Sequence, residues 1–266
     1  MSNPEYQYQH GILPNFFLKK FQKDGKIYSI TKDKLLNASK YGGGINLFDS
    51  RHLDDPRMLE KEWGKHENNV VPLLKRMNEE YILTSDDKDL LEKWIKTNEL
   101  KRKDIIKNKG IVRLLGHYSE HDQEYISSTA EKIRLCYFLK HLRDIESLNT
   151  GTFWREDCTW RVIKTGYPLC ISTYGLIWGD NDHLYGVGRE DYALYMVLDR
   201  FKYLRISHKQ NLRVTSLEAV VPYQLYMAMS NRNNEFNKEF GDAELLCHPD
   251  DKDYFIFKDA EGNILP

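Results

Sequence analysis

The sequence has few cysteines, no close pair among them and no long apolar run. The four cysteines are Cys136, Cys158, Cys170 and Cys247. Their spacing fits neither a CxxC site nor a zinc ribbon, so we expect thiols in a reducing cytosol. No apolar run approaches the ~20 residues that a membrane span needs, and residues 1–9 lack the apolar core of a signal peptide. The sequence therefore predicts a cytoplasmic protein without a membrane partner.

The sequence also lacks the common catalytic consensus patterns and any strong excess of charge. It contains no G-x-S-x-G, no H-E-x-x-H and no Walker A pattern. Gly42, Gly43 and Gly44 are flexible enough to wrap a phosphate, but no Lys-Ser/Thr follows them and no strand immediately precedes them, which favours a simple loop. The net charge of -1 gives no overall attraction to nucleic acid or to a membrane, so a basic binding surface has to be local.

What the sequence does contain is enough apolar material for a globular core. Of the 266 residues, 41% are hydrophobic and 30% are charged, which indicates a globular protein and not a disordered chain. The 17 tyrosines suit sheet faces and grooves, where a ring is half-buried and its hydroxyl reaches a polar partner. The length fits one large domain or two closely packed small ones, and we interpret residues 1–266 as a single domain.

The N-terminal segment predicts a compact helix–turn–strand unit. Pro14 suits the first turn of a short helix, because its missing N–H is not needed there. The apolar face of this helix consists of Phe17, Leu18 and Phe21. Asp24 and Gly25 predict a turn, and the alternating residues 26–31 predict a strand to which Ile27 contributes an apolar side chain.

Residues from about 50 to 148 show the three- and four-residue periodicity of helices. Asp54, Asp55 and Pro56 predict the start of the first helix, and Pro72 predicts a kink or a break farther along it. The apolar face of this helix consists of Met58, Leu59, Trp63, His66, Val70, Leu73, Leu74 and Met77. The start of a second helix is predicted at residues 84–87. Its apolar stripe consists of Leu90, Leu91, Trp94 and Ile95, and a third helix is predicted at residues 123–148.

From about residue 150 the pattern changes from helical to strand-like. Short β-branched or aromatic runs predict strands at residues 158–163, 169–178, 192–198, 203–207, 244–247 and 254–258, with a helix at 216–231. Helices first and strands afterwards indicate an α+β fold. In this fold the N-terminal helix–turn–strand unit and the helical region pack on a C-terminal, mainly antiparallel sheet. The strand-rich part then comprises residues from about 152 to 266, together with the strand near residues 26–31.

Scattered polar residues provide the candidates for catalysis. His10, beside the aromatic N-terminal unit, is a candidate general acid or base, and a capping or surface role is the alternative. Glu60, Glu67 and Arg143 lie on predicted helices. An Arg–Glu pair among them would be structural or would orient a phosphorylated ligand. The candidate catalytic set is therefore His10, Glu60, Glu67 and Arg143.

The most basic stretch of the chain, residues 93–109, is a candidate contact surface for phosphate groups. Its central residues are Lys101, Arg102 and Lys103, and Arg134 lies on the flank of the third predicted helix. The alternative is a solvent-exposed helix end and loop, which has the same composition. The candidate ligand-binding set is therefore Lys101, Arg102, Lys103 and Arg134.

A candidate metal site lies in a glycine-flanked loop after one of the predicted strands. Asp180 and Asp182 provide carboxylates there, with Asn181 between them and His183 after them. These are ligand types that bind divalent cations, and the alternative is a hydrophilic β-turn of the same composition. The sequence identifies no cofactor.

The N-terminal residues carry a resemblance to a known family. Pro14-x-Phe16-x-Leu18-x-x-Phe21, followed by Asp24-Gly25-Lys26-Ile27-Tyr28, resembles the opening signature of a bacterial and phage family known as domain of unknown function 4238. The similarity continues through residues 46–48 and 55–67, and it returns at residues 139–143 and 244–247. The activity of that family is unassigned, so the resemblance implies a fold and a microbial or phage context and not a reaction.

Two features depart from the pattern of that family. Its His lies three residues before the proline, whereas His10 lies four before it and Gly11 occupies the expected place. The family also carries a Thr-Ser-Asp-Asn-Pro run, and the corresponding residues 171–175 contain neither Asp nor Asn. Asp180 or Asp182 is the candidate replacement for the missing carboxylate.

Together these observations lead to a first hypothesis and an alternative. The first is a cytoplasmic microbial or phage protein that acts in host–virus conflict by binding a nucleotide or nucleic acid. As an enzyme, it would also hydrolyse this ligand. The alternative is a non-catalytic binding or inhibitor module that sequesters a ligand or a protein partner, which the tyrosines and the missing Asp-Asn run favour. The expected partner is a phosphorylated small molecule, a nucleic acid or a protein, and whether the chain is an enzyme stays open.

Overall fold

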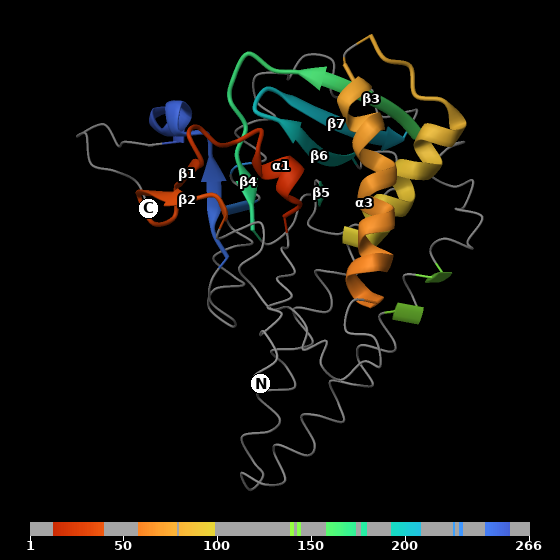
Figure 1. Ribbon diagram of the computed structural model, residues 1–266. Helices are drawn as coiled ribbons and strands as arrows, with labels where there is room; N and C mark the ends of the chain where they lie inside the picture. Colours follow the sequence, from red (N-terminus) through yellow and green to blue (C-terminus); the bar gives the residue numbers. More distant parts are fainter. Residues whose placement is uncertain are drawn as a thin grey trace, which may run out of the picture.

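The protein has an α+β fold in which helices accompany two antiparallel sheets, as the order of helical and strand-like segments predicted. The computed structural model describes residues 13–39, 58–78, 80–98, 139–140, 143–144, 158–173, 177–179, 193–208, 226, 229–230 and 243–255. Figure 1 shows the two sheets side by side, with α3 beside the sheet that contains β3, β6 and β7. Among the described residues, no helix combines the length and the apolar character that crossing a membrane requires.

The first sheet joins segments from opposite ends of the chain. Its strands are β1 (Lys26–Ser29), β2 (Lys34–Asn37), β4 (Ile171–Ser172) and β8 (Leu245–Cys247), in the order β2-β1-β8-β4. Every pair is antiparallel. Beside β8, the buried carboxylate of Glu244 accepts a hydrogen bond from the Ser29 hydroxyl at 2.7 Å and pairs with Lys32. These side chains fasten the N-terminal hairpin to the C-terminal strand.

The N-terminal unit forms as predicted, with differences at its ends. Helix α1 (Asn15–Leu18) begins after Pro14, which lies outside the helix at φ −58° and ψ 139° and not in its first turn. Asp24 and Gly25 both adopt positive φ, at 51° and 72°. They form the two-residue loop of a tight hairpin, across which Lys23 and Lys26 exchange backbone hydrogen bonds of 2.9 and 2.8 Å. An Asp-Gly pair suits this turn because both of its residues tolerate the left-handed region.

The predicted strand at residues 26–31 is shorter and less regular than its pattern suggested. Strand β1 ends at Ser29, and its last three residues are all buried, so it shows no alternation of buried and exposed side chains. It lies between β2 and β8. The chain then turns through Asp33, at φ 48°, into β2, which the sequence analysis did not predict. Three of the four residues of β2 are exposed, so it lacks the apolar alternation by which a strand is recognised.

The first long helix, α3 (Met58–Arg76), buries the predicted face. Its buried residues are Trp63, His66, Val70, Leu73 and Leu74, with Met77 buried just beyond its end. The predicted break at Pro72 is wrong, because the helix continues through it. Pro72 itself is exposed, while Leu73 and Leu74 anchor the following turn in the core. The predicted start at residues 54–56 lies outside the described residues.

The second predicted helix is confirmed at residues 85–98, where Leu91, Trp94 and Ile95 are buried. Of the third predicted helix, the structure describes residues 139–140 and 143–144, which are helical. Of the helix predicted at residues 216–231, it describes residue 226 and residues 229–230, which are helical as well.

The second sheet consists of β3 (Cys158–Lys164), β5 (Ile177–Gly179), β6 (Ala193–Asp199) and β7 (Lys202–His208), in the order β3-β7-β6-β5. The strands predicted near β3, β6 and β7 are therefore confirmed. The single strand predicted at 169–178 is wrong, because β4 and β5 belong to different sheets. The strand predicted at 254–258 is wrong for its first two residues, which end a 3-10 helix, η3 (Pro249–Phe255).

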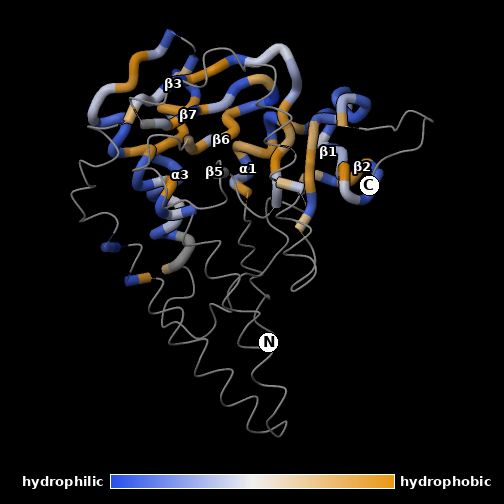
Figure 2. Tube along the Cα trace, turned by 180° about the vertical axis from the view of Figure 1, so that it is seen from behind, coloured by the Kyte–Doolittle hydropathy of each residue, from blue (hydrophilic) through white to orange (hydrophobic). Residues whose placement is uncertain are grey.

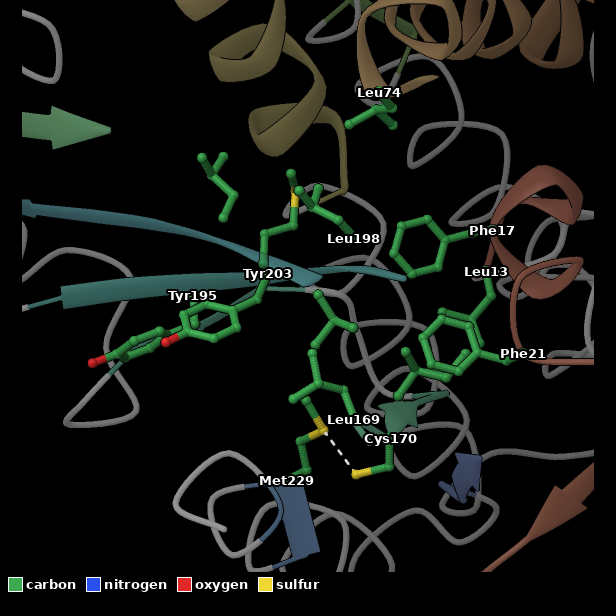
Figure 3. Close-up of a cluster of buried hydrophobic side chains, with 14 of the residues drawn as sticks. Leu13, Phe17, Phe21, Leu74, Leu169, Cys170, Tyr195, Leu198, Tyr203 and Met229 are labelled. Carbon is green, nitrogen blue, oxygen red and sulfur yellow. Dashed lines mark hydrogen bonds between the residues drawn. The ribbon is translucent and has the colours of Figure 1, made fainter. Parts of the chain in front are cut away.

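The core lies where the N-terminal unit meets the second sheet and α3. Phe17, Phe21, Leu74 and Leu198 converge in Figure 3. The rings of Phe17 and Phe21 stack with centroids 6.0 Å apart, and Lys20 Nζ donates a hydrogen bond to the Leu198 carbonyl at 2.8 Å. Apolar residues follow β3, β6 and β7 in Figure 2, as expected for strands buried by such packing.

An ion pair fastens the β6–β7 turn to η3. The Arg200 guanidinium donates hydrogen bonds from Nε and Nη2 to the two carboxylate oxygens of Asp251. Asp251 is only 2% exposed, so its charge requires such a partner. These hydrogen bonds also raise the pKa of Arg200 above its ordinary value. The Arg200 carbonyl accepts a hydrogen bond from the Leu169 N–H at 2.8 Å, which holds the segment before β4 against the same turn.

Replacing Phe17 with alanine should lower the free energy of unfolding by about 3–5 kcal/mol, because it leaves a cavity among fully buried side chains. The matched control is Leu35→Ala on the exposed face of β2, which should change it by less than about 0.5 kcal/mol. Urea denaturation measures both. Equal effects of the two changes would contradict the position of α1 in the core.

Candidate functional site

A cavity of about 730 Å³ lies between β3 and the segment that follows α3. One wall consists of residues 80–83 and Lys88, and the other consists of residues 158–164 of β3. Arg205, on the neighbouring strand β7, also lines it. We call this space the β3 cavity. Its volume is typical of sites for small molecules the size of a nucleotide.

The first wall is held by one carboxylate at the start of helix 85–98. Asp87 Oδ2 accepts hydrogen bonds from the Thr84 N–H at 2.9 Å, the Thr84 hydroxyl at 2.8 Å and the Tyr81 hydroxyl at 3.1 Å. In return, the Asp87 N–H donates to Thr84 Oγ1 at 3.2 Å. This is a reciprocal capping box, as residues 84–87 predicted. It fixes the ring of Tyr81 beside the cavity.

The surroundings of Asp87 also set its pKa. Burial by itself would raise the pKa of this carboxyl, but the hydrogen bonds from Thr84 and Tyr81 and the nearby Arg76 guanidinium outweigh it and hold the pKa below its ordinary value. Asp87 is therefore ionised at neutral pH. Its negative charge is compensated within the wall by the hydrogen bonds from Thr84 and Tyr81 and by the Arg76 guanidinium.

The second wall is the edge strand of the second sheet. Strand β3 pairs antiparallel with β7 in one continuous register from Cys158 opposite His208 to Lys164 opposite Lys202. In this register Arg161 lies directly opposite Arg205. On the other side of β7, Tyr195 of β6 lies opposite Arg205. Residues directly opposite in an antiparallel pair share one face of the sheet, so the two arginines and Tyr195 form a row across three strands.

Arg205 has an environment in which arginine is rarely found. The residue is only 8% exposed, yet its Nε and Nη2 have no hydrogen-bond partner in the part of the chain that the structure describes. These two nitrogens form one edge of the guanidinium, the same edge with which Arg200 binds Asp251. A buried guanidinium normally needs such a partner, because losing its hydration costs several kcal/mol or more. Arg205 therefore lines the β3 cavity with a guanidinium of which one bidentate edge is buried and has no partner among the described residues.

The charge of the described lining is strongly positive. Its cationic residues are Lys88, Arg161, Lys164 and Arg205, against a single carboxylate, Glu80. Arg161 and Lys164 are exposed on the edge strand, whereas Arg205 is buried one strand farther in. Like charges placed directly opposite in a sheet, such as Arg161 and Arg205, destabilise the pairing. An anion bound between them would remove that repulsion.

Of the candidate set from the predicted helices, the structure describes the side chains of Arg143 and Glu67. Arg143 is exposed, with Nε 3.8 Å from Glu62 Oε1 and Nη2 3.3 Å from Met58 Sδ. Its described carboxylate neighbour is thus Glu62, which also pairs with Lys65, and the pair lies at the surface and is not buried. Glu67 is half-buried on α3, and Glu60 belongs to the same helix. The side chain of Glu60 lies outside the described part.

The remaining candidates lie outside the described residues. They are His10, Lys101, Arg102, Lys103, Arg134, Asp180 and Asp182. Their proposed roles in catalysis, phosphate binding and metal binding stay predictions. In the described segments, no group of three or more His, Cys, Asp or Glu side chains is placed to hold a metal ion.

The cysteines in the described segments are thiols, as expected. Cys158, Cys170 and Cys247 are buried and form no disulfide, and Cys136 lies outside these segments. Burial raises the pKa of Cys170 to about 12, and burial likewise raises the pKa of Cys247. Cys170 and Cys247 are therefore protonated at neutral pH and poor nucleophiles.

The sequence analysis missed the residues that line the β3 cavity. One signal was present in the sequence itself, because Arg205 interrupts an otherwise apolar run from Tyr203 to Ile206. A charged residue in the middle of a buried strand marks a side chain that needs a partner. Pairing with Arg161, by contrast, depends on the register between distant strands.

Comparison of the chain with protein-family models, with curated proteins and with solved structures finds no match. The function therefore has to be argued from the residues and the geometry of the site.

Replacing Asp87 with asparagine should lower the free energy of unfolding at pH 7 by about 1–2 kcal/mol, because the capping box loses its ionised acceptor. A lowered folded-state pKa adds stability that is complete above the ordinary value of 3.8 and is lost as the pH falls through the folded value. The difference between wild type and Asp87→Asn should therefore shrink below about pH 4. Denaturation at several pH values measures it.

The control for this experiment is Asp86→Asn, the exposed neighbour of Asp87 in the same helical turn. It removes the same charge near the helix start but none of the hydrogen bonds described above for the wall. If Asp86→Asn destabilises the protein as much as Asp87→Asn does, the stabilisation comes from helix electrostatics in general and not from the capping box.

Proposed function

We propose that the protein binds a phosphorylated ligand, a nucleotide or a nucleic acid, in the β3 cavity. The observation that carries the proposal is Arg205, a buried guanidinium with an unused bidentate edge on a cavity wall. Phosphate oxygens match this edge in spacing and charge, as carboxylate oxygens do for Arg200 and Asp251. An anion of this kind would supply the partner that Arg205 lacks.

The other cations of the lining support a phosphate more than a carboxylate. Arg161 lies across from Arg205, and Lys164 and Lys88 lie farther along the lining. A carboxylate has two oxygens and one negative charge, which Arg205 alone would satisfy. A phosphate group offers additional oxygens and more charge, so it can engage Arg161 at the same time.

An aromatic ring and an acceptor beside the cations favour a nucleotide among phosphorylated ligands. Tyr81 lines the cavity, and its hydroxyl is tied to Asp87, so its ring is held in place. Aromatic rings of this kind stack on nucleobases irrespective of their identity. The exposed carboxylate of Glu80 can accept hydrogen bonds from sugar hydroxyls or from a base.

The geometry of the β3 cavity supports binding of a ligand more strongly than it supports hydrolysis of that ligand. Within the described lining, Glu80 is the sole carboxylate and there is no histidine, so this part of the cavity provides no acid–base pair. This agrees with the alternative of a binding module that sequesters its ligand. Catalysis by His10, Glu60, Glu67 and Arg143 stays a prediction.

We retain the cellular setting as part of the proposal. The resemblance of residues 14–28 to domain of unknown function 4238 supports a microbial or phage origin. The role in host–virus conflict rests on the candidate polar residues and on the basic stretch at residues 93–109. In such a role, a cytoplasmic protein that sequesters a nucleotide or the product of nucleic-acid cleavage would act without turning over its ligand.

Replacing Arg205 with methionine should weaken binding of ATP and of pyrophosphate by roughly ten- to hundredfold, because charge-assisted hydrogen bonds contribute about 1.5–3 kcal/mol each. Without ligand, the variant should be as stable as wild type or more stable, since a buried cation lacking a partner is removed. Isothermal titration calorimetry measures the affinity, and thermal unfolding with and without ATP measures the stability.

Lys34→Met serves as the matched control, because Lys34 is an exposed cation of β2 in the other sheet. It should leave both affinities and the ATP-induced rise in Tm unchanged. The proposal is wrong if Arg205→Met binds ATP and pyrophosphate as wild type does. It is equally wrong if neither compound binds the wild-type protein at millimolar concentration.

A further inference from the structure

We infer that the β3 cavity selects a terminal phosphate monoester, the phosphate at the end of a nucleotide or nucleic-acid chain, over an internal phosphodiester. This inference rests on the proposed function, that a phosphate binds at Arg205. The inference specifies which kind of phosphate can reach Arg205.

The first argument is the depth of Arg205 relative to the other cations. Arg161 and Lys164 belong to the edge strand and are exposed, whereas Arg205 belongs to the next strand in and is 8% exposed. An internal phosphodiester carries chain on both sides, and both sides would have to pass back out along β3. A terminal phosphate has a substituent on one side only and can enter end-on.

The second argument is charge. Arg205 and Arg161 face each other across the β3–β7 pair, so two positive charges meet at one position of the sheet. A phosphate monoester carries about −1.5 to −2 at pH 7, whereas each phosphodiester of a nucleic acid carries about −1. Only the monoester therefore neutralises both guanidinium groups with a single phosphate.

The third argument is the number of oxygens. The Nε and Nη2 edge of Arg205 takes two oxygens in the arrangement that Arg200 shows with Asp251. A phosphodiester has only two non-bridging oxygens, so Arg161 would have to share one of them with Arg205. A monoester has three, which leaves one for Arg161 from the opposite strand.

The test compares matched ligands that differ in one group. The first pair is an eight-residue oligothymidylate with a 5′-phosphate and the same oligonucleotide with a 5′-hydroxyl. The second pair is AMP and its phosphate methyl ester, which converts the monoester to a diester without changing the base or the sugar. Calorimetric or fluorescence-anisotropy titrations of the full-length protein measure the four affinities.

We expect the 5′-phosphate to raise the affinity of the oligonucleotide about tenfold or more, and methylation of AMP to lower its affinity by a similar factor. Arg205→Met should remove both differences, and Lys34→Met should preserve them. Arg161→Gln, at an exposed position that tolerates substitution, should reduce both differences without removing them. It provides a second variant should Arg205→Met fail to fold.

The outcomes separate this inference from the proposed function. If the two oligonucleotides bind equally well and both lose affinity in Arg205→Met, the inference is overturned and the proposed function stands with internal phosphates as the ligand. If the 5′-phosphate still raises affinity in Arg205→Met, the terminal phosphate binds elsewhere and the inference is overturned. If none of the four ligands binds wild-type protein, both are overturned.

Discussion

The register between β3 and β7 is the constraint on which the candidate site depends. On one face of this pair, Trp160 and Val162 lie opposite Ile206 and Leu204, and all four are buried. A shift by one residue would move every side chain of β3 to the other face of the sheet and expose these apolar groups. Core packing thus places Arg205 on the opposite face of the sheet. There it lies across from Arg161 and lines the cavity.

The β6–β7 hairpin contains an internal comparison between two arginines. Arg200, in the turn, binds Asp251 with its Nε and Nη2, and this pair holds η3 against the second sheet. Arg205, in the strand, has the same edge unoccupied although it is the more buried of the two. A guanidinium with a structural role obtains its carboxylate within the fold. One without a carboxylate is suited to an anion that arrives from outside.

Local pattern predicted the helices, the turn and most strands, but not their assembly. The buried face of α3, the Thr84–Asp87 capping box and the Asp24–Gly25 turn follow from interactions within a few residues, which a sequence displays directly. The apolar strands β6 and β7 were recognised for the same reason. Strand β2 was not, because its exposed side chains carry no apolar alternation and its pairing with β1 stabilises it instead. Whether residues 169–178 form one strand or two depends on sheets built from distant segments.

In the candidate site, too, the sequence displays the type of a residue but not the surroundings in which the fold places it. Arg143 was selected from the sequence for its chemistry, yet it lies exposed near Glu62, where solvent and salt screen its charge. Arg205 has the same chemistry but a different dielectric environment, which makes a missing partner costly and a bound anion correspondingly favourable. Exposed cations such as Arg161 and Lys164 can attract many anions to the rim of the cavity. The buried one admits only those whose shape and charge can replace its lost hydration, so selectivity comes from burial and not from the number of charges.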